Sequence, residues 1–220
     1  PDRVFMVGAL GLDSIARLNL LKRDELEASL NFKFRSRNFV VTFHPVTLES
    51  ATAEDQLQEL LLALEGLKDT GLIFTLPNAD TDGRVLIEMI ERFTQRHDNA
   101  RAYPSLGQLR YLSCVAECDG VIGNSSSGII EVPSLHKATI NIGDRQRGRL
   151  RAASVINCAP LREEISGSIA HMYSSKFRDG LATVQNPYGD GGASARVCSV
   201  ICSFPLEGIL KKRFFDLVER

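Results

Sequence analysis

The stretch Arg37-Asn38-Phe39-Val40-Val41-Thr42-Phe43 ends in five consecutive aromatic or β-branched residues, a pattern typical of a buried strand. A segment of helical length, residues 54–67, follows it and places Leu57, Leu60 and Leu64 on one face. A strand followed by an amphipathic helix is the repeating unit of a parallel α/β sheet. The unit recurs along the chain, with further strands expected at 71–76, 101–103, 120–123, 138–142 and 154–156, and helices at 83–97, 109–118, 127–135, 161–173, 193–204 and 206–218.

Right-handed crossovers wind such units into a single open sheet with helices on both faces. The fold class that we predict is therefore α/β, with a doubly wound, mostly parallel, Rossmann-like sheet of about six strands. The 220 residues leave room for one large domain but not for two full ones.

The composition argues against several classes of protein. The 26 Lys and Arg residues and 27 Asp and Glu residues leave a formal charge of −1, so we expect no binding to nucleic acid. No apolar stretch approaches the ~20 residues that cross a bilayer, so we expect no membrane segment. The N-terminal residues do not resemble a secretory signal, which favours a cytoplasmic location.

The five cysteines, an odd number, suit free thiols in a reducing compartment. Cys114 and Cys118 are spaced i, i+4 within an expected helix, and so are Cys198 and Cys202. Zinc ribbons use C-x-x-C instead. We interpret both pairs as buried core thiols and expect no metal site.

Polar residues follow the expected strands at the point where each strand ends. His44 follows the first strand, Asn78 the second, the run Asn124-Ser125-Ser126-Ser127-Gly128 the fourth, and Gly143-Asp144-Arg145 the fifth. Because the carboxyl ends of parallel strands open onto one edge, we expect these residues to converge there.

Gly123-Asn124-Ser125-Ser126-Ser127-Gly128 lies between a strand and a helix, where backbone N–H groups and hydroxyls can bind a phosphate or diphosphate. An ordinary serine cap of a helix is an equal alternative when the motif is taken alone. Asn124-Ser125-Ser126 also matches a glycosylation sequon, which we interpret as accidental without a secretory signal.

Glu131 lies four residues after Ser127 on the same expected helix face, where it could accept hydrogen bonds from a ribose diol. The alternative is an acid that simply favours the first turn of a helix. Arg145 opens a cluster of four Arg in seven residues, and guanidinium groups match phosphate oxygens well. The cluster lacks interleaved aromatic residues, which disfavours nucleic acid as its partner.

His44 ends a strand, where it could act as an acid, a base or a phosphate donor, although a lone His is more often structural. Gly8-Ala9-Leu10-Gly11 lacks the third glycine of the dinucleotide motif, and no Gly-Lys-Ser/Thr occurs. NAD and ATP are therefore disfavoured, and we expect no cofactor.

Six short motifs occur in a fixed order along almost the whole chain. They are Arg3-Val4-Phe5-Met6-Val7-Gly8, His44-Pro45-Val46-Thr47, Leu76-Pro77-Asn78-Ala79-Asp80, Gly123-Asn124-Ser125-Ser126-Ser127-Gly128-Ile129-Ile130-Glu131, Asn141-Ile142-Gly143-Asp144-Arg145-Gln146-Arg147-Gly148-Arg149 and Asn186-Pro187-Tyr188-Gly189-Asp190-Gly191. Together they resemble the C-terminal part of the hydrolysing UDP-N-acetylglucosamine 2-epimerases of sialic-acid-type biosynthesis.

The resemblance implies the C-terminal half of a GT-B fold, in which two Rossmann-type lobes face each other across a cleft and the C-terminal lobe holds UDP. It implies that Ser125, Ser126 and Arg145 hold the diphosphate and that Glu131 holds the ribose. His44 is implied as the catalytic residue.

By the same resemblance, Asn78 belongs to the UDP site, and both His44 and Asn78 face the phosphate and the sugar. The Gly189-Asp190-Gly191 loop either lines the cleft or prepares the following helix, and simple turn chemistry is its plainer interpretation.

The reaction implied by the resemblance is elimination of UDP across C1 and C2 of the sugar, followed by addition of water with inversion at C2. The products are UDP and a free sugar of the N-acetylmannosamine type. Proton removal at C2 requires a carboxylate base, which the resemblance assigns to an N-terminal lobe. The natural sugar stays open between UDP-N-acetylglucosamine and a 2,4-diacetamido relative.

We therefore expect a fragment: residues 1–20 as the last strand and linker of a missing N-terminal lobe, 21–204 as the UDP-binding domain, and 205–220 as a C-terminal crossover helix. The fragment is expected to be inactive alone, and the apolar stripe of its last helix predicts either a homo-oligomer or packing of that helix on the domain's own sheet. Two alternatives remain, the nucleotide-binding half of a GT-B glycosyltransferase and a non-catalytic UDP-sugar-binding module.

Overall fold

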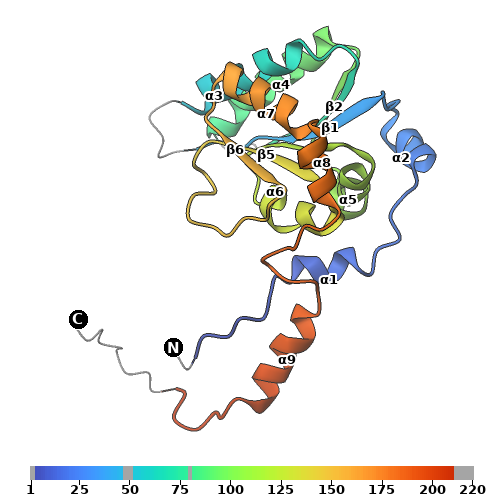
Figure 1. Cartoon of the computed structure of the whole chain (residues 1–220). Coiled ribbons are helices and arrows are strands. Elements are labelled where there is room, and N and C mark those ends of the chain that lie inside the picture. Colours follow the sequence, from blue (N-terminus) through green and yellow to red (C-terminus); the bar gives the residue numbers. More distant parts are fainter. Residues whose placement is uncertain (1–2, 47–51, 79–80, 211–220) are drawn as a thin grey trace.

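The protein is built around one six-stranded sheet, seen in a computed structural model that describes residues 3–46, 52–78 and 81–210 (Figure 1). All five neighbouring pairs of strands are parallel, and the strand order is β3-β2-β1-β4-β5-β6. This doubly wound order confirms the predicted fold class. The strands are β1 (Arg37–Thr42), β2 (Thr70–Thr75), β3 (Ala100–Tyr103), β4 (Gly120–Gly123), β5 (Ala138–Ile142) and β6 (Val155–Cys158).

Helices cover both faces of the sheet. In Figure 1, α3, α4 and α7 lie over one face, and α2, α5 and α6 lie on the other. The helices are α1 (Gly11–Ile15), α2 (Arg23–Leu30), α3 (Ala53–Glu65), α4 (Thr81–Arg96), α5 (Gly107–Glu117), α6 (Ser127–Ile130), the 3₁₀ turn η1 (Val132–Leu135), α7 (Arg162–Met172), α8 (Ser175–Leu181) and α9 (Ala193–Ser203).

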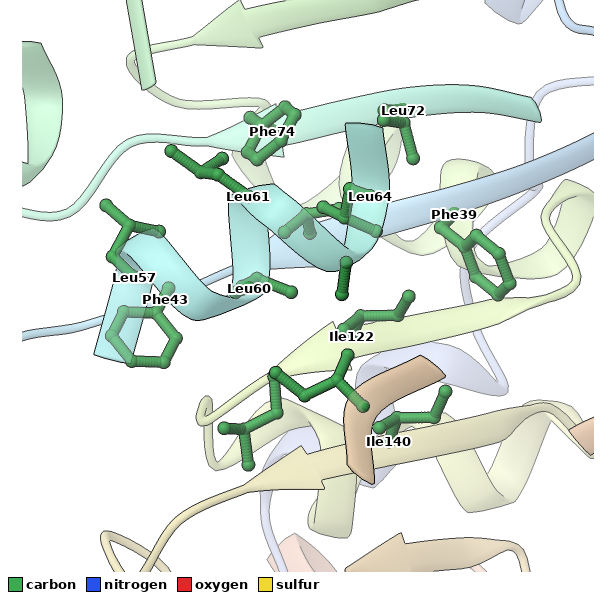
Figure 2. Packing of buried hydrophobic residues seen from close by; sticks show 14 of the residues in the cluster. Phe39, Phe43, Leu57, Leu60, Leu61, Leu64, Leu72, Phe74, Ile122 and Ile140 are labelled. Carbon is green, nitrogen blue, oxygen red and sulfur yellow. The ribbon is translucent and has the colours of Figure 1, made fainter. Parts of the chain in front are cut away.

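The side chains of β1 alternate between two hydrophobic cores, as the pleat of a strand requires. Phe39 and Val41 join the core under α3, whereas Val40 joins the core under α2 and α5. Figure 2 shows the leucines of α3 packed against the strands of the first core. A strand buried on both faces reads as a continuous apolar run, which is why this stretch identified the fold.

Gly123 allows β1 and β4 to approach each other closely at their carboxyl ends. Its φ is +140°, and a Cβ at this position would overlap the Thr42 carbonyl. A glycine is therefore required where the chain leaves β4 for the serine run.

Two helical predictions differ from the structure, and three short helices were missed. The helix expected at 127–135 is a single α turn followed by η1, because Pro133 cannot continue the α-helical hydrogen bonds. Residues 206–210 form turns rather than the start of a helix, and 211–220 lie outside the described residues. The short helices α1, α2 and α8 were not predicted.

The cysteines agree with the sequence interpretation only in part. All five are free, and Cys114 and Cys118 are buried in the core as predicted. Cys198 and Cys202 are exposed, so their assignment to the core was wrong. The error arises because α9 extends away from the sheet, leaving most of its surface accessible (Figure 1).

The N-terminal segment contacts α9. Arg196 Nε donates a hydrogen bond to the Val7 carbonyl at 2.9 Å, and Phe5 packs edge-on against Phe204 with ring centroids 5.9 Å apart. Residues 3–10 pair with no strand among the described residues, so the strand expected there as part of another lobe stays a prediction.

None of the described helices combines the length and apolarity needed to cross a membrane.

Candidate functional site

The candidate site lies where β1 and β4 run side by side, between the two halves of the sheet. The chain leaves β1 toward β2 on one side and leaves β4 toward β5 on the other, so the strand order reverses at this point. Ligands of open α/β sheets bind outside the carboxyl ends of the strands at such a reversal. The register pairs Thr42 with Gly123, which brings the segments after both strands together.

The side-chain amide of Asn124 joins the ends of β1 and β4. Its Oδ1 accepts a hydrogen bond from the His44 N–H at 2.8 Å, and its Nδ2 donates to the His44 carbonyl at 2.9 Å. The Asn124 side chain is completely buried. The backbone of His44 is therefore fixed at both of its polar atoms, and His44 is half-buried at the rim.

The loop after β5 closes onto the same residue. Arg145 Nη1 donates to the Asn124 carbonyl at 3.1 Å, and Gln146 Nε2 donates to it at 2.7 Å. Gln146 is buried, whereas Arg145 stays exposed. Partial burial, with the charge of Arg149, lowers the pKa of Arg145, but a guanidinium remains protonated over the physiological range. The charged Arg145 guanidinium, which has further N–H groups to donate, therefore lies beside the serine run.

The serine run forms a tight turn between β4 and α6. Ser125 and Ser126 are half-buried, and Ser125 Oγ accepts a weak hydrogen bond from the Ser127 N–H at 3.4 Å. Among the described residues, the backbone N–H groups of Ser125 and Ser126 donate no hydrogen bond. Because α6 has only one turn, its helix dipole would contribute little to binding an anion. Binding would depend mainly on these N–H groups, on the serine hydroxyls and on Arg145.

Glu131 lies at the end of α6 rather than inside a long helix. Burial raises the pKa of its carboxyl, and the Ser127 hydroxyl partly opposes this rise. Gly11 of α1 lies against the same carboxylate, because a Cβ at Gly11 would stand 3.1 Å from Glu131 Oε1. The predicted ribose ligand is therefore a half-buried acid at the end of α6, with α1 lying against its carboxylate.

The remaining predicted residues lie at the edge of this cluster. Asn78 is exposed three residues beyond β2, and no hydrogen bond joins it to the other candidates within the described part of the chain. The Gly189-Asp190-Gly191 loop leads into α9, and Ala9 N–H donates to the Tyr188 carbonyl just before it. The described residues contain no cluster of three or more His, Cys, Asp or Glu side chains.

Sequence reasoning missed two contributors to this geometry. Asn124 was placed in the polar run after the fourth strand and in an accidental sequon, but its role in joining the strand ends was not predicted. Gln146 lies inside the quoted Asp144-Arg145-Gln146 motif and was given no role. The role of Gln146 is seen only in the structure, where Gln146 and Arg145 both donate to the Asn124 carbonyl.

The sequence comparisons identify the family. Residues 1–202 match the profile of the family described as UDP-N-acetylglucosamine 2-epimerase. The chain belongs to the UDP-N-acetylglucosamine 2-epimerase family. A polysialic acid biosynthesis protein P7 of Escherichia coli is 38% identical over the full chain and 56% of its own length. A GDP/UDP-N,N'-diacetylbacillosamine 2-epimerase (hydrolyzing) of Campylobacter jejuni is 34% identical over 98% of the chain and 56% of its length.

Solved structures of epimerases share the fold. The Methanocaldococcus jannaschii UDP-GlcNAc 2-epimerase, solved in complex with UDP-GlcNAc and UDP, matches with a TM-score of 0.65 and 17% identity over 91% of this chain and 55% of that chain. The Neisseria meningitidis UDP-GlcNAc 2-epimerase bound to UDP-GlcNAc matches with a TM-score of 0.63 and 15% identity, covering 87% and 51%. The chain thus spans about half the length of the proteins it matches.

Proposed function

We propose that this chain binds the UDP part of a UDP-sugar as one half of a hydrolysing UDP-N-acetylglucosamine 2-epimerase. The observation that carries the proposal is the convergence of the His44 backbone, the Asn124 amide and the Arg145 guanidinium where the strand order reverses. Arg145 and the free N–H groups of Ser125 and Ser126 present donors to a diphosphate. Family membership supplies the class of reaction.

In the proposed reaction, a base removes the proton from C2 of the sugar while the bond between C1 and the UDP oxygen breaks. Water then adds across the resulting double bond, with its hydroxyl at C1 and a proton delivered to C2 from the opposite face. Arg145, Ser125 and Ser126 would stabilise the negative charge that develops on the departing UDP. His44 would act beside the phosphate and sugar, and Asn78 would contact the UDP-sugar from the end of β2.

The sugar is proposed to be N-acetylglucosamine or a 2,4-diacetamido relative. One relative in this family is a polysialic acid biosynthesis protein, and another is named for diacetylbacillosamine. The product would then be an N-acetylmannosamine-type sugar suited to sialic-acid-type biosynthesis. Release of free sugar without an acceptor distinguishes this function from a glycosyltransferase.

Arg145→Ala tests the proposed site directly. Because a hydrogen bond to a charged group contributes about 1.5–3 kcal/mol, we expect UDP affinity to fall about tenfold to a hundredfold. Titration calorimetry with UDP on the 220-residue chain measures this change. Arg92→Ala removes the same charge from the exposed face of α4 and should leave UDP affinity unchanged. Equal affinities for Arg145→Ala and the unmodified chain would refute the assignment.

A further inference from the structure

Three side-chain oxygens of α5 and the α6 turn are buried, each without a hydrogen bond of ordinary geometry among the described residues. They are the Tyr111 hydroxyl on α5, Ser127 Oγ at the start of α6, and Glu131 Oε2 at its end. Buried polar atoms are nearly always paired, so we expect these three groups to hydrogen-bond to one another, to water or to a ligand.

The three groups are close enough to influence one another's ionisation. The Ser127 hydroxyl lowers the pKa of both Tyr111 and Glu131, and Glu131 in turn raises the pKa of Tyr111. Burial is the main effect on Tyr111 and raises its pKa to about 12, so the phenol keeps its proton at neutral pH. Tyr111 therefore enters the network as a donor.

The donor and acceptor inventory allows one consistent direction for the hydrogen bonds. An ionised Glu131 can only accept, and Ser127 has a single O–H to give it. The lone pairs of Ser127 Oγ are then left for the Tyr111 hydroxyl. Thr42 Oγ1, which pairs with Thr75 Oγ1 at 2.7 Å, also lies near the phenol and keeps a lone pair, so it is the competing acceptor for the Tyr111 hydroxyl.

We propose that Tyr111 is a positioning residue of the nucleotide site, whose hydroxyl orients Ser127 and, through Ser127, aims the Glu131 carboxylate at the ribose diol of the ligand. This inference rests on the proposed function, because it takes Glu131 as the ribose ligand. Tyr111 itself does not touch the ligand. Its loss should therefore affect only the part of the binding free energy that depends on the diol.

The test compares the binding of UDP and of 2′-deoxy-UDP, which lacks the diol, to the 220-residue chain by calorimetry. Tyr111→Phe removes one oxygen and keeps the ring. We expect UDP affinity to fall about threefold to tenfold while 2′-deoxy-UDP affinity stays nearly constant. The pH at which UDP binding is half-maximal should also rise, because Glu131 loses part of the network that favours its ionised form.

Tyr173→Phe is the matched control. The Tyr173 hydroxyl likewise has no hydrogen bond of ordinary geometry among the described residues, but its ring packs on Arg37 and Phe39, at the end of β1 opposite the site. This variant should leave both affinities and the pH profile unchanged. Ser127→Ala should reproduce the effect of Tyr111→Phe, and the double variant should lose no more than either single one, because both break the same connection.

The outcomes separate this inference from the proposed function. If Glu131→Gln lowers the preference for UDP over 2′-deoxy-UDP but Tyr111→Phe and Ser127→Ala do not, the role of Tyr111 is overturned while the UDP site stands. If the unmodified chain binds no UDP, or shows no preference that Glu131→Gln removes, the ribose assignment fails and the inference fails with it. If Tyr111→Phe does not fold, Ser127→Ala decides the question through the same comparison of UDP and 2′-deoxy-UDP affinities.

Discussion

Asn124 satisfies four polar groups at the junction of β1, β4 and the loop after β5. Its amide pairs with both backbone polar atoms of His44, and its carbonyl accepts from Arg145 and Gln146. Because the Asn124 side chain is completely buried, its loss would remove two hydrogen bonds from the His44 backbone and leave a cavity between the two strand ends.

Asn124→Ala should therefore destabilise the chain by about 2–4 kcal/mol and weaken UDP binding per folded molecule. Denaturant unfolding and calorimetry measure the two effects. Asn99→Ala is the matched control, because Asn99 is also buried and donates to the Leu67 and Thr70 carbonyls at the opposite end of the sheet. Asn99→Ala should lower the free energy of unfolding by a similar amount and leave UDP affinity unchanged. Equal losses of affinity in both variants would show that Asn124 acts only on folding.

Glu131 illustrates a conflict between stability and binding at a single residue. Burial raises the pKa of its carboxyl above the value of 4.5 for an unperturbed Glu. As pH rises between 4.5 and the raised pKa, the unfolded chain has released a proton that the folded chain still holds, so folding stability falls. Glu131→Gln keeps the volume and removes this loss.

We expect Glu131→Gln to melt at a higher temperature than the unmodified chain at pH 7 and to bind UDP about tenfold more weakly or worse. The difference in melting temperature should vanish below pH 4, where both folded and unfolded chains carry a protonated Glu131. Thermal melts from pH 4 to 8, together with calorimetry, test both parts. A variant that melts lower at pH 7 yet binds UDP normally would make Glu131 a structural residue.

At the scale of elements, Asp13 connects α1 to the N-terminus of α9. Its Oδ1 accepts from the Ala193 N–H at 2.9 Å, and its Oδ2 accepts from the Ser194 N–H at 2.8 Å. Hydrogen bonds from Ser194 are the main reason that the pKa of Asp13 is lowered to about 2. An acid whose pKa is lowered on folding stabilises the fold above its ordinary value of 3.8 and loses that contribution as pH falls toward 2.

Asp13→Asn keeps only one oxygen acceptor, so one of these two N–H groups loses its partner. Hydrogen exchange of the first turn of α9 should become several-fold faster in Asp13→Asn at pH 6, with little change in β1 and β4. The variant should also lose the acid-dependent weakening of α9 between pH 4 and 2. Unchanged exchange in α9 would show that other contacts, such as that of Arg196 with Val7, hold the helix.

The central strands were predictable from sequence because they are short apolar runs buried on both faces, as in Phe39–Phe43 and Gly120–Gly123. The convergence at one edge followed from the parallel order alone. Helix ends were less predictable: Pro133 could have indicated the break after α6, whereas α8 has no buried residue and so carries no amphipathic pattern. The contacts of Asn124, Gln146 and Tyr111 depend on tertiary packing that spacing does not encode.

At the scale of the whole molecule, the surface includes large apolar side chains that are exposed in the described part of the chain. Met6 and Leu210 are 98% and 96% exposed, and Val4, Ile201 and Leu206 are exposed as well. They lie on the N-terminal segment, on α9 and just after it, away from the sheet. Contacts with another copy or with further protein would bury this surface, and the homo-oligomer stays a prediction.

In the proposed function, this chain supplies the UDP contacts and a further lobe supplies the base that removes the C2 proton. The chain spans about half the length of its relatives, and the proposed site supplies diphosphate and ribose contacts together with His44. Its buried acid, Glu131, is assigned to the ribose, which leaves deprotonation of C2 without a base in the proposed mechanism. Leaving-group stabilisation alone does not break the C2–H bond.

We therefore expect the 220-residue chain to bind UDP and to release no N-acetylmannosamine from UDP-N-acetylglucosamine above the uncatalysed rate. The chain extended to the full length of its relatives should release both UDP and free sugar, measured by chromatography of the reaction mixture. His44→Ala in that longer protein should reduce turnover strongly and shift the melting temperature by only a few degrees, since Asn124 contacts the His44 backbone and not its ring. Enzymatic release of sugar by the 220-residue chain alone would place the C2 base within it and overturn this division.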